Sequence, residues 1–120
     1  MPPPSQLAIA TSSVNRLLKD VASYHKELVE QEGQVRALEE KIKNGQNDDD
    51  GNASFMLKQQ KTAVEQTKAV FSTLQDRIEA AASKLEDQIK LREESGAPEQ
   101  ELEAAKETLA KAKAEQNGSS

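Results

Sequence analysis

Two series of apolar residues repeat every seven positions along most of this chain. The two series consist of Val14, Val21, Leu28, Val35 and Ile42, then Leu57, Val64, Phe71, Ile78 and Leu85. The companion positions, three residues further on, are Leu17, Tyr24, Gln31, Leu38, Gln60, Thr67, Leu74 and Ala81. An α-helix turns by about 100° per residue, so a seven-residue repeat keeps these side chains on one stripe. The pattern predicts two long helices that pack through a coiled-coil-like seam.

A polar segment between the two series predicts that the chain reverses direction. Residues 44–52 read Asn-Gly-Gln-Asn-Asp-Asp-Asp-Gly-Asn, and these residue types favour turns over helices. We therefore expect a first helix at 5–43, an acidic loop at 44–53 and a second, antiparallel helix at 54–94. Ser5 and Ser54 are the candidate N-caps of the two helices, because serine oxygens accept hydrogen bonds from the first-turn N–H groups.

A shorter third helix is expected at 98–113. Gly96 suits the left-handed position after a helix, and the fixed φ of Pro98 suits a helix start. The weak seam of this helix consists of Leu102, Ala105, Leu109 and Ala112. A two-helix hairpin would leave several apolar flanking residues exposed, namely Leu18, Val70, Ile89 and Leu91. The third helix should cover them. The sequence thus predicts one all-α domain over residues 1–120, an elongated antiparallel three-helix bundle with a disordered tail at 114–120.

The seam itself is unusually polar. Gln31, Gln60, Thr67 and Gln88 occupy companion positions that are apolar in most coiled coils. Such residues fix the register of a seam at a cost in stability.

Composition and charge exclude several functions. The 120 residues are 31% charged with net charge −5, and only three are aromatic. The two long helices carry balanced charge, with six basic and six acidic residues at 5–43 and seven of each at 55–95. They lack the basic stripe that nucleic-acid binding requires. No apolar stretch reaches the roughly 18 residues that span a membrane, and no apolar segment follows Met-Pro-Pro-Pro-Ser, so we expect no signal peptide there. The absence of cysteine fits a reducing cytosol.

Neither catalysis nor metal binding is expected. The chain has one histidine, His25, and no cysteine, so it cannot assemble a zinc site or a histidine-based nucleophile system. Aligning Gly51 with the invariant glycine of a calcium loop puts Gln46 and Leu57 where Asp and Glu ligands belong. We therefore predict a protein that is not an enzyme and that uses no cofactor.

The first half of the second helix is locally basic. Lys58, Lys61 and Lys68 outnumber Glu65 there. These lysines are either solubilising charges or a rim that meets an acidic partner.

A set of motifs spans the two predicted long helices. In the first helix these are Val14-Asn-Arg-Leu17 with Lys19, then Tyr24, Lys26-Glu27 and Gln31-Glu32. In the second helix they are Leu57-Lys-Gln-Gln60 and the block from Gln75 to Ala81. Together these motifs resemble the tubulin-binding cofactor A family, and the resemblance covers roughly residues 7–112. Members of this family can carry a proline midway along the second helix, where this chain has Ser72. We therefore expect a straighter second helix here.

The resemblance implies a small non-catalytic chaperone. It would capture quasi-native β-tubulin after chaperonin release and pass it on toward αβ-heterodimer assembly, without using nucleotide. It further implies a cytoplasmic, cytoskeleton-associated protein, a monomer or homodimer, with other tubulin-folding cofactors as additional partners. Tubulin is acidic like this chain, so binding should depend on local complementarity. Accordingly, the expected contacts are the basic residues on the rims of the two long helices: Arg16, Lys19, Lys26, Lys58, Lys61, Lys68 and Arg77.

The alternative function is a structural coiled-coil or three-helix scaffold or adaptor unrelated to tubulin. A spectrin-like repeat usually buries a Trp in its first helix, and this chain has none. A prefoldin-like subunit should show period-2 alternation between its helices, which is absent here.

Overall fold

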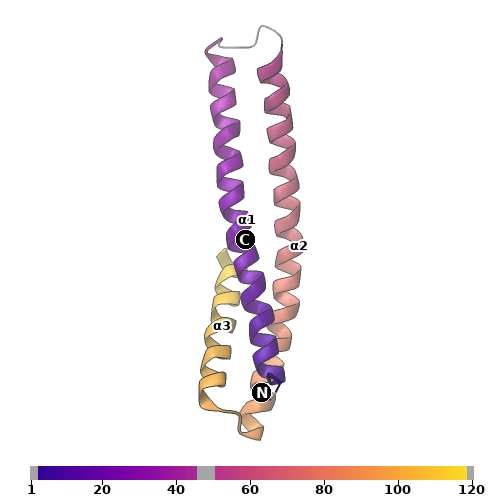
Figure 1. The fold of residues 1–120 in the computed structure, drawn as a ribbon, viewed down its shortest axis with the longest axis vertical. Coiled ribbons are helices and arrows are strands. Elements are labelled where there is room, and N and C mark those ends of the chain that lie inside the picture. The colour runs from indigo at the N-terminus through magenta and orange to yellow at the C-terminus, as the bar shows by residue number, and fades with distance from the viewer. Residues whose placement is uncertain (1–2, 46–50, 119–120) are drawn as a thin grey trace. The chain divides into compact units, whose positions relative to one another are not determined.

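Three α-helices form the part of the protein that the structure describes. A computed structural model describes residues 3–45 and 51–118. The helices are α1 (Gln6–Lys43), α2 (Asn52–Ser95) and α3 (Glu99–Gly118), shown in Figure 1. They contain 38, 44 and 20 residues respectively. The predicted all-α helical bundle with a shorter third helix is therefore confirmed.

The start of α1 is capped by Ser5, as predicted. The N–H of Ala8 donates to Ser5 Oγ at 3.0 Å, and the N–H of Ile9 donates to the Ser5 carbonyl at 2.9 Å. Ser5 Oγ in turn donates to Glu101 Oε1 on α3 at 2.6 Å. One serine thus both begins the first helix and holds it to the third.

The start of α2 differs from the prediction. The helix begins at Asn52, two residues before the expected Ser54, and the N–H of Phe55 donates to the Gly51 carbonyl at 3.0 Å. Gly51 has a φ of 75°, which glycine adopts without strain. Asn52 and Ala53 therefore belong to α2, and the side chain of Ala53 is buried, at 6% exposure. The expected acidic loop 44–53 is therefore too long at its C-terminal end, and residues 46–50 lie outside the described part of the chain.

The end of α2 agrees with the prediction, but the end of α3 does not. Gly96 has a φ of 81°, and the N–H groups of Gly96 and Ala97 both donate to the Arg92 carbonyl, at 2.9 and 3.0 Å. At the other end, α3 continues to Gly118, whereas residues 114–120 were expected to be a disordered tail. Glu115 is half-buried and accepts a hydrogen bond from Gln75 Nε2 at 3.5 Å, which extends the packing of this last turn. Residues 119–120 lie outside the described part.

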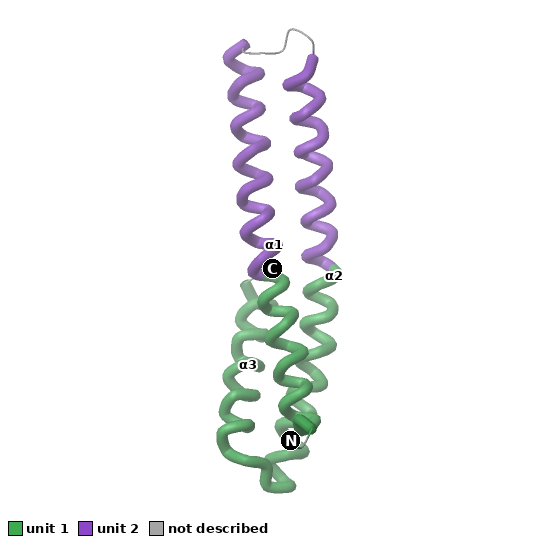
Figure 2. The backbone as a smooth tube through the Cα atoms, viewed as in Figure 1, with its two compact units in different colours: residues 1–21, 73–120 green, residues 22–72 purple. Residues whose placement is uncertain are grey.

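The chain forms two compact units, coloured separately in Figure 2. Unit 1 comprises residues 1–21 and 73–120, and unit 2 comprises residues 22–72. Both long helices contribute to both units, and α2 continues through Ser72 without a break.

Unit 1 is a three-helix bundle. The hydrogen bonds between its first and third helices pair Ser5 with Glu101 and Asn15 with Thr108, so α1 and α3 run parallel. The ion pairs Glu86–Lys113 and Glu93–Lys106 show that α2 and α3 run antiparallel. The buried residues of unit 1 are Leu7, Val14, Val21, Leu74, Ile78, Ala82, Leu85, Ile89, Ala105, Thr108 and Ala112.

Unit 2 is a two-helix hairpin formed by the second part of α1 and the first part of α2. Gln31 contacts Thr67, and Tyr24 contacts Phe71 with ring centroids 6.5 Å apart, so the two helices run antiparallel. Among the described residues of unit 2, only Ala53, Val64 and Thr67 are buried. Its other seam residues are half-buried: Tyr24, Leu28, Gln31, Val35, Leu38, Ile42, Leu57, Gln60 and Phe71.

The predicted seam is confirmed throughout, since every residue of the two series and their companion positions is buried or half-buried. The apolar flanks agree only in part with the prediction. Ile89 is buried and Leu18 is half-buried in unit 1, and Val70 is half-buried in unit 2. Leu91, however, stays 56% exposed.

Candidate partner-binding surface

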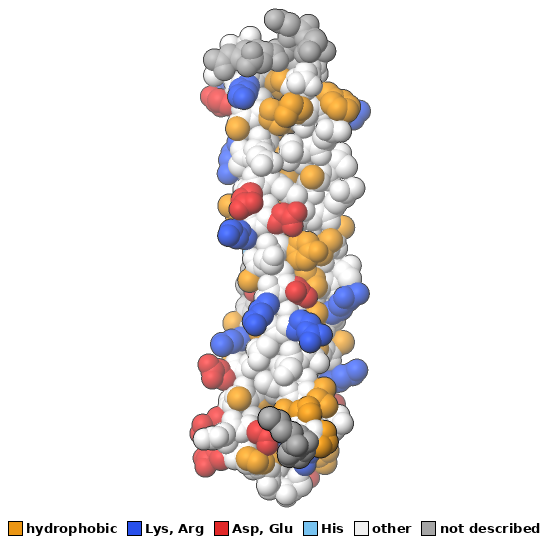
Figure 3. Space-filling model, in the orientation of Figure 1, with side chains coloured by type: hydrophobic (Ala, Val, Ile, Leu, Met, Phe, Trp, Pro, Cys, Tyr) orange, Lys and Arg blue, Asp and Glu red, His pale blue; other side chains and the backbone are white. Residues whose placement is uncertain are grey.

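All seven basic residues predicted to bind a partner are exposed. They lie on α1 or α2 and are Arg16, Lys19, Lys26, Lys58, Lys61, Lys68 and Arg77. Three of them belong to unit 1 and four to unit 2. On the face drawn in Figure 3, basic side chains are interspersed with acidic and hydrophobic ones.

The structure brings two of the unit 1 residues together. Arg16 and Lys19 line one shallow depression with Ser12 and Asn15. Arg77 lies elsewhere, in a groove formed by α1 and α2. The predicted unit 1 contacts are therefore two separate features rather than one basic patch.

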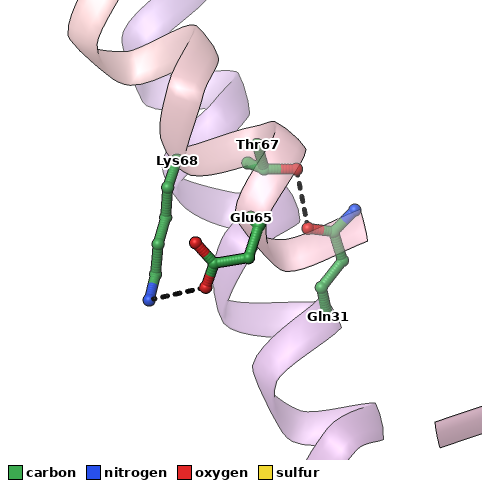
Figure 4. Close-up of polar contacts among 4 residues, drawn as sticks. All are labelled: Gln31, Glu65, Thr67 and Lys68. Atoms are coloured by element: carbon green, nitrogen blue, oxygen red, sulfur yellow. Dashed lines mark hydrogen bonds and ion pairs between the residues drawn. The ribbon is translucent and has the colours of Figure 1, made fainter. Parts of the chain in front are cut away.

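In unit 2, two of the lysines have acidic neighbours. Lys61 Nζ lies 3.7 Å from Glu39 Oε2 on the facing helix, and Lys68 Nζ lies 3.9 Å from Glu65 Oε1 one turn away. Figure 4 shows the second pair beside the hydrogen bond that Thr67 Oγ1 donates to Gln31 Oε1 at 2.7 Å. Because solvent-exposed ion pairs contribute only about 0–1 kcal/mol, a partner carboxylate could replace these glutamates at little cost.

A second feature of unit 2 is exposed apolar surface at the start of α2. Phe55 is 59% exposed and lines a shallow depression together with Lys58, Gln59 and Thr62. Val29 on α1 is 65% exposed. Met56, next to Phe55, is 43% exposed as well. Exposed apolar side chains of this number are normal on protein surfaces.

The groove that contains Arg77 was missed by the sequence analysis. It has a volume of about 610 Å³, and α1 contributes Ile9, Ala10 and Leu17 to it. From α2, Ala81 contributes to the floor and Lys84 stands on the rim near Arg77. The spacing of Arg77, Ala81 and Lys84 on one helical face was readable from the sequence. The groove itself was not, because the repeat does not say which side of the α1–α2 pair α3 covers.

Residues 3–45 and 51–118 contain no group of three or more His, Cys, Asp or Glu side chains that could hold a metal ion. No helix in this described part is long and apolar enough to cross a membrane. The only histidine, His25, is exposed, and its ring centroid lies 4.6 Å from that of Phe71.

Comparison with known protein families identifies the chain. Residues 2–109 match the family described as tubulin binding cofactor A. The chain belongs to the tubulin binding cofactor A family. The match includes all of α1 and α2, the first half of α3 and all seven candidate basic residues. No match was found among curated proteins or among solved structures.

Family membership establishes the general role. Tubulin binding cofactor A is a family of tubulin-folding cofactors, a chaperone family rather than a catalytic one. The partner of this chain is accordingly tubulin. The resemblance found in the sequence is thereby confirmed, and the unrelated scaffold or adaptor is no longer needed as an alternative.

Proposed function

We propose that this protein captures quasi-native β-tubulin after its release from the chaperonin and passes it on toward αβ-heterodimer assembly. The match to the tubulin binding cofactor A family over residues 2–109 carries this proposal. Capture requires no nucleotide and no covalent chemistry. We place it in the cytoplasm in association with the cytoskeleton, by a monomer or homodimer, with other tubulin-folding cofactors as further partners.

The character of the surface supports reversible holding. Tight interfaces usually depend on a few large aromatic or arginine side chains that become fully desolvated. The exposed surface described here carries one large aromatic residue, Phe55, and several exposed Lys–Glu ion pairs on helix faces. Exposed charges of this kind accelerate encounter and select the partner without slowing its release. A chaperone that must hand over its client benefits from that balance.

We assign the contact with β-tubulin to the exposed basic residues on the rims of α1 and α2. The three lysines of unit 2 on α2, namely Lys58, Lys61 and Lys68, are the centre of this assignment because two of them are already held beside carboxylates. Arg16, Lys19, Lys26 and Arg77 complete the set. Since the whole chain carries a net charge of −5, these local positive groups are what an acidic surface would meet.

The test is a pull-down with β-tubulin from dissociated heterodimer. We expect the wild-type chain to retain β-tubulin, and a triple variant with Lys58→Glu, Lys61→Glu and Lys68→Glu to retain at least about tenfold less. Helicity measured by circular dichroism should not change, because all three side chains are exposed.

The matched control reverses three exposed lysines of unit 1, Lys90, Lys111 and Lys113, which likewise lie within 4 Å of glutamates. This control should retain β-tubulin like the wild type. Loss of binding in both triple variants would mean that only net charge matters. No retention by the wild-type chain would contradict the proposed function itself.

A further inference from the structure

The α1–α2 pair of unit 1 has two flanks, and α3 occupies only one of them. Ser5 at the start of α1, Asn15 on α1, and Gln75, Glu86 and Glu93 on α2 contact α3. None of these residues lines the 610 Å³ groove, and no residue of α3 does either. The groove therefore lies along the flank that the third helix leaves uncovered.

Apolar side chains from both helices line part of this groove, together with the uncharged polar residues Gln6, Ser13 and Gln88. Ala10, Leu17 and Ala81 are half-buried there, and Ile9 at the rim is 44% exposed. On the opposite flank, α3 docks through the buried small residues Ala105, Thr108 and Ala112. A further helix packed into the groove would bury the floor and complete a four-helix arrangement.

The charges on the two flanks of α2 have opposite signs at the same spacing. Toward α3, α2 presents Glu86 and Glu93, which pair with Lys113 at 3.9 Å and Lys106 at 2.7 Å. Toward the groove, α2 presents Arg77 and Lys84, again seven residues apart, with Asp87 as the acidic member of the lining. Seven residues correspond to roughly 10 Å along a helix, or two turns. The Arg77 and Lys84 pair on this flank thus has the spacing of the Glu86 and Glu93 pair on the other flank, with the opposite charge.

We propose that this groove docks an acidic amphipathic helix of the bound tubulin, and this inference rests on the proposed function. The apolar stripe of that helix lies on Leu17 and Ala81. Two carboxylates about two turns apart meet Arg77 and Lys84, as Lys106 and Lys113 of α3 meet the glutamates on the other flank. The acidic partner is favoured because α3 shows that α2 recognises a helix through opposite charges at this spacing.

The first experiment compares two charge-reversed double variants in β-tubulin binding. The test variant carries Arg77→Glu and Lys84→Glu, and the control carries Lys90→Glu and Lys111→Glu, which are exposed lysines outside the groove. We expect the test variant to bind about tenfold more weakly, with the control within about twofold of the wild type. Equal affinity of test and control variants would overturn the groove assignment while leaving tubulin capture intact.

The second experiment asks directly what enters the groove. The chain contains no cysteine, so a single introduced cysteine can be labelled uniquely with a photo-crosslinker. Ala80→Cys places the label in the groove, and Ala110→Cys places it on the exposed outer side of α3. We expect crosslinks to β-tubulin from position 80 and few from position 110, with the crosslinked tubulin peptide mapping to an acidic helix.

Three other results would overturn the proposal, each in a distinguishable way. A crosslink from position 80 to a second copy of this chain would make the groove a homodimer interface. Tubulin binding without any crosslink from position 80 would leave the groove empty and the proposed function standing. A wild-type chain that does not bind tubulin at all would remove the proposed function and this inference together.

Discussion

In unit 1 the α1–α2 pair packs against α3, whereas in unit 2 the same two helices pack only against each other. The consequence is visible at equivalent positions of one helix. Val14 and Val21 of α1 are 0% and 1% exposed in unit 1, but the larger Leu28 and Ile42 of unit 2 are only half-buried. On this stripe, unit 1 buries Val14, Val21, Leu74, Ile78 and Leu85, whereas among the described residues of unit 2 only Val64 and Thr67 are buried. A two-helix seam always leaves an open side.

The two units also differ in how polar groups enter the seam. In unit 1, polar side chains join α3 to α1, at the edge of the core for Ser5 and Glu101 and inside the core for Thr108 and Asn15. In unit 2, the hydrogen bond between Thr67 and Gln31 lies within the seam itself. No buried side-chain N or O atom in the described residues lacks a hydrogen-bond partner. The buried polar side chains of unit 2 are therefore hydrogen-bonded, but its seam is less buried than that of unit 1. Weaker packing of this kind suits a region that changes partners.

The largest expected effect comes from truncating one leucine in each unit. Leu85→Ala in unit 1 should lower the free energy of unfolding by about 2–5 kcal/mol. Leu85 is 0% exposed, so removing its side chain would leave a cavity that neighbouring side chains fill only in part. Leu57→Ala in unit 2 should cost roughly half as much, because Leu57 is half-buried already. Urea unfolding followed by circular dichroism measures both. Equal losses would contradict the difference in burial between the units.

An intermediate effect is expected from placing a larger side chain where α3 packs against α1 and α2, the contact that distinguishes unit 1. Ala105→Leu should destabilise the protein by about 1–3 kcal/mol, since Ala105 is 0% exposed and α3 would have to move away. The matched control, Ala110→Leu on the exposed side of the same helix, should stay within about 0.5 kcal/mol. Thermal unfolding distinguishes the two variants. A neutral Ala105→Leu would mean that α3 is not closely packed.

The smallest expected effect concerns the polar seam of unit 2. Thr67→Val should cost about 1 kcal/mol, because the Gln31 oxygen loses its donor. Adding Gln31→Leu should recover that loss, because both polar partners are then replaced by apolar groups. A double-mutant cycle by thermal unfolding measures the coupling, which we expect to be roughly 1 kcal/mol. Additive single effects would show that this hydrogen bond does not stabilise unit 2.

The candidate site was predictable only as far as single residues. All seven basic side chains are exposed, as expected from their positions off the seam. The sequence did not predict that Arg16 and Lys19 share one depression while Arg77 lies in a separate groove. Lys84 was missed because its importance depends on the groove beside it. Thr108 was missed as a core residue because a polar side chain was not expected between Ala105 and Ala112. Its hydroxyl is accommodated by donating to Asn15 Oδ1 at 3.3 Å.

The sequence by itself determined the three helices, the seam between the two long ones and the family. Periodicity, capping residues and turn-forming segments act locally, so each can be read along the chain. Only the tertiary structure decided which flank of the α1–α2 pair α3 covers, and hence where the groove lies. A seven-residue repeat marks a stripe with two similar sides, and contacts between distant residues choose between them. Here those contacts join Ser5 to Glu101, Glu86 to Lys113 and Glu93 to Lys106.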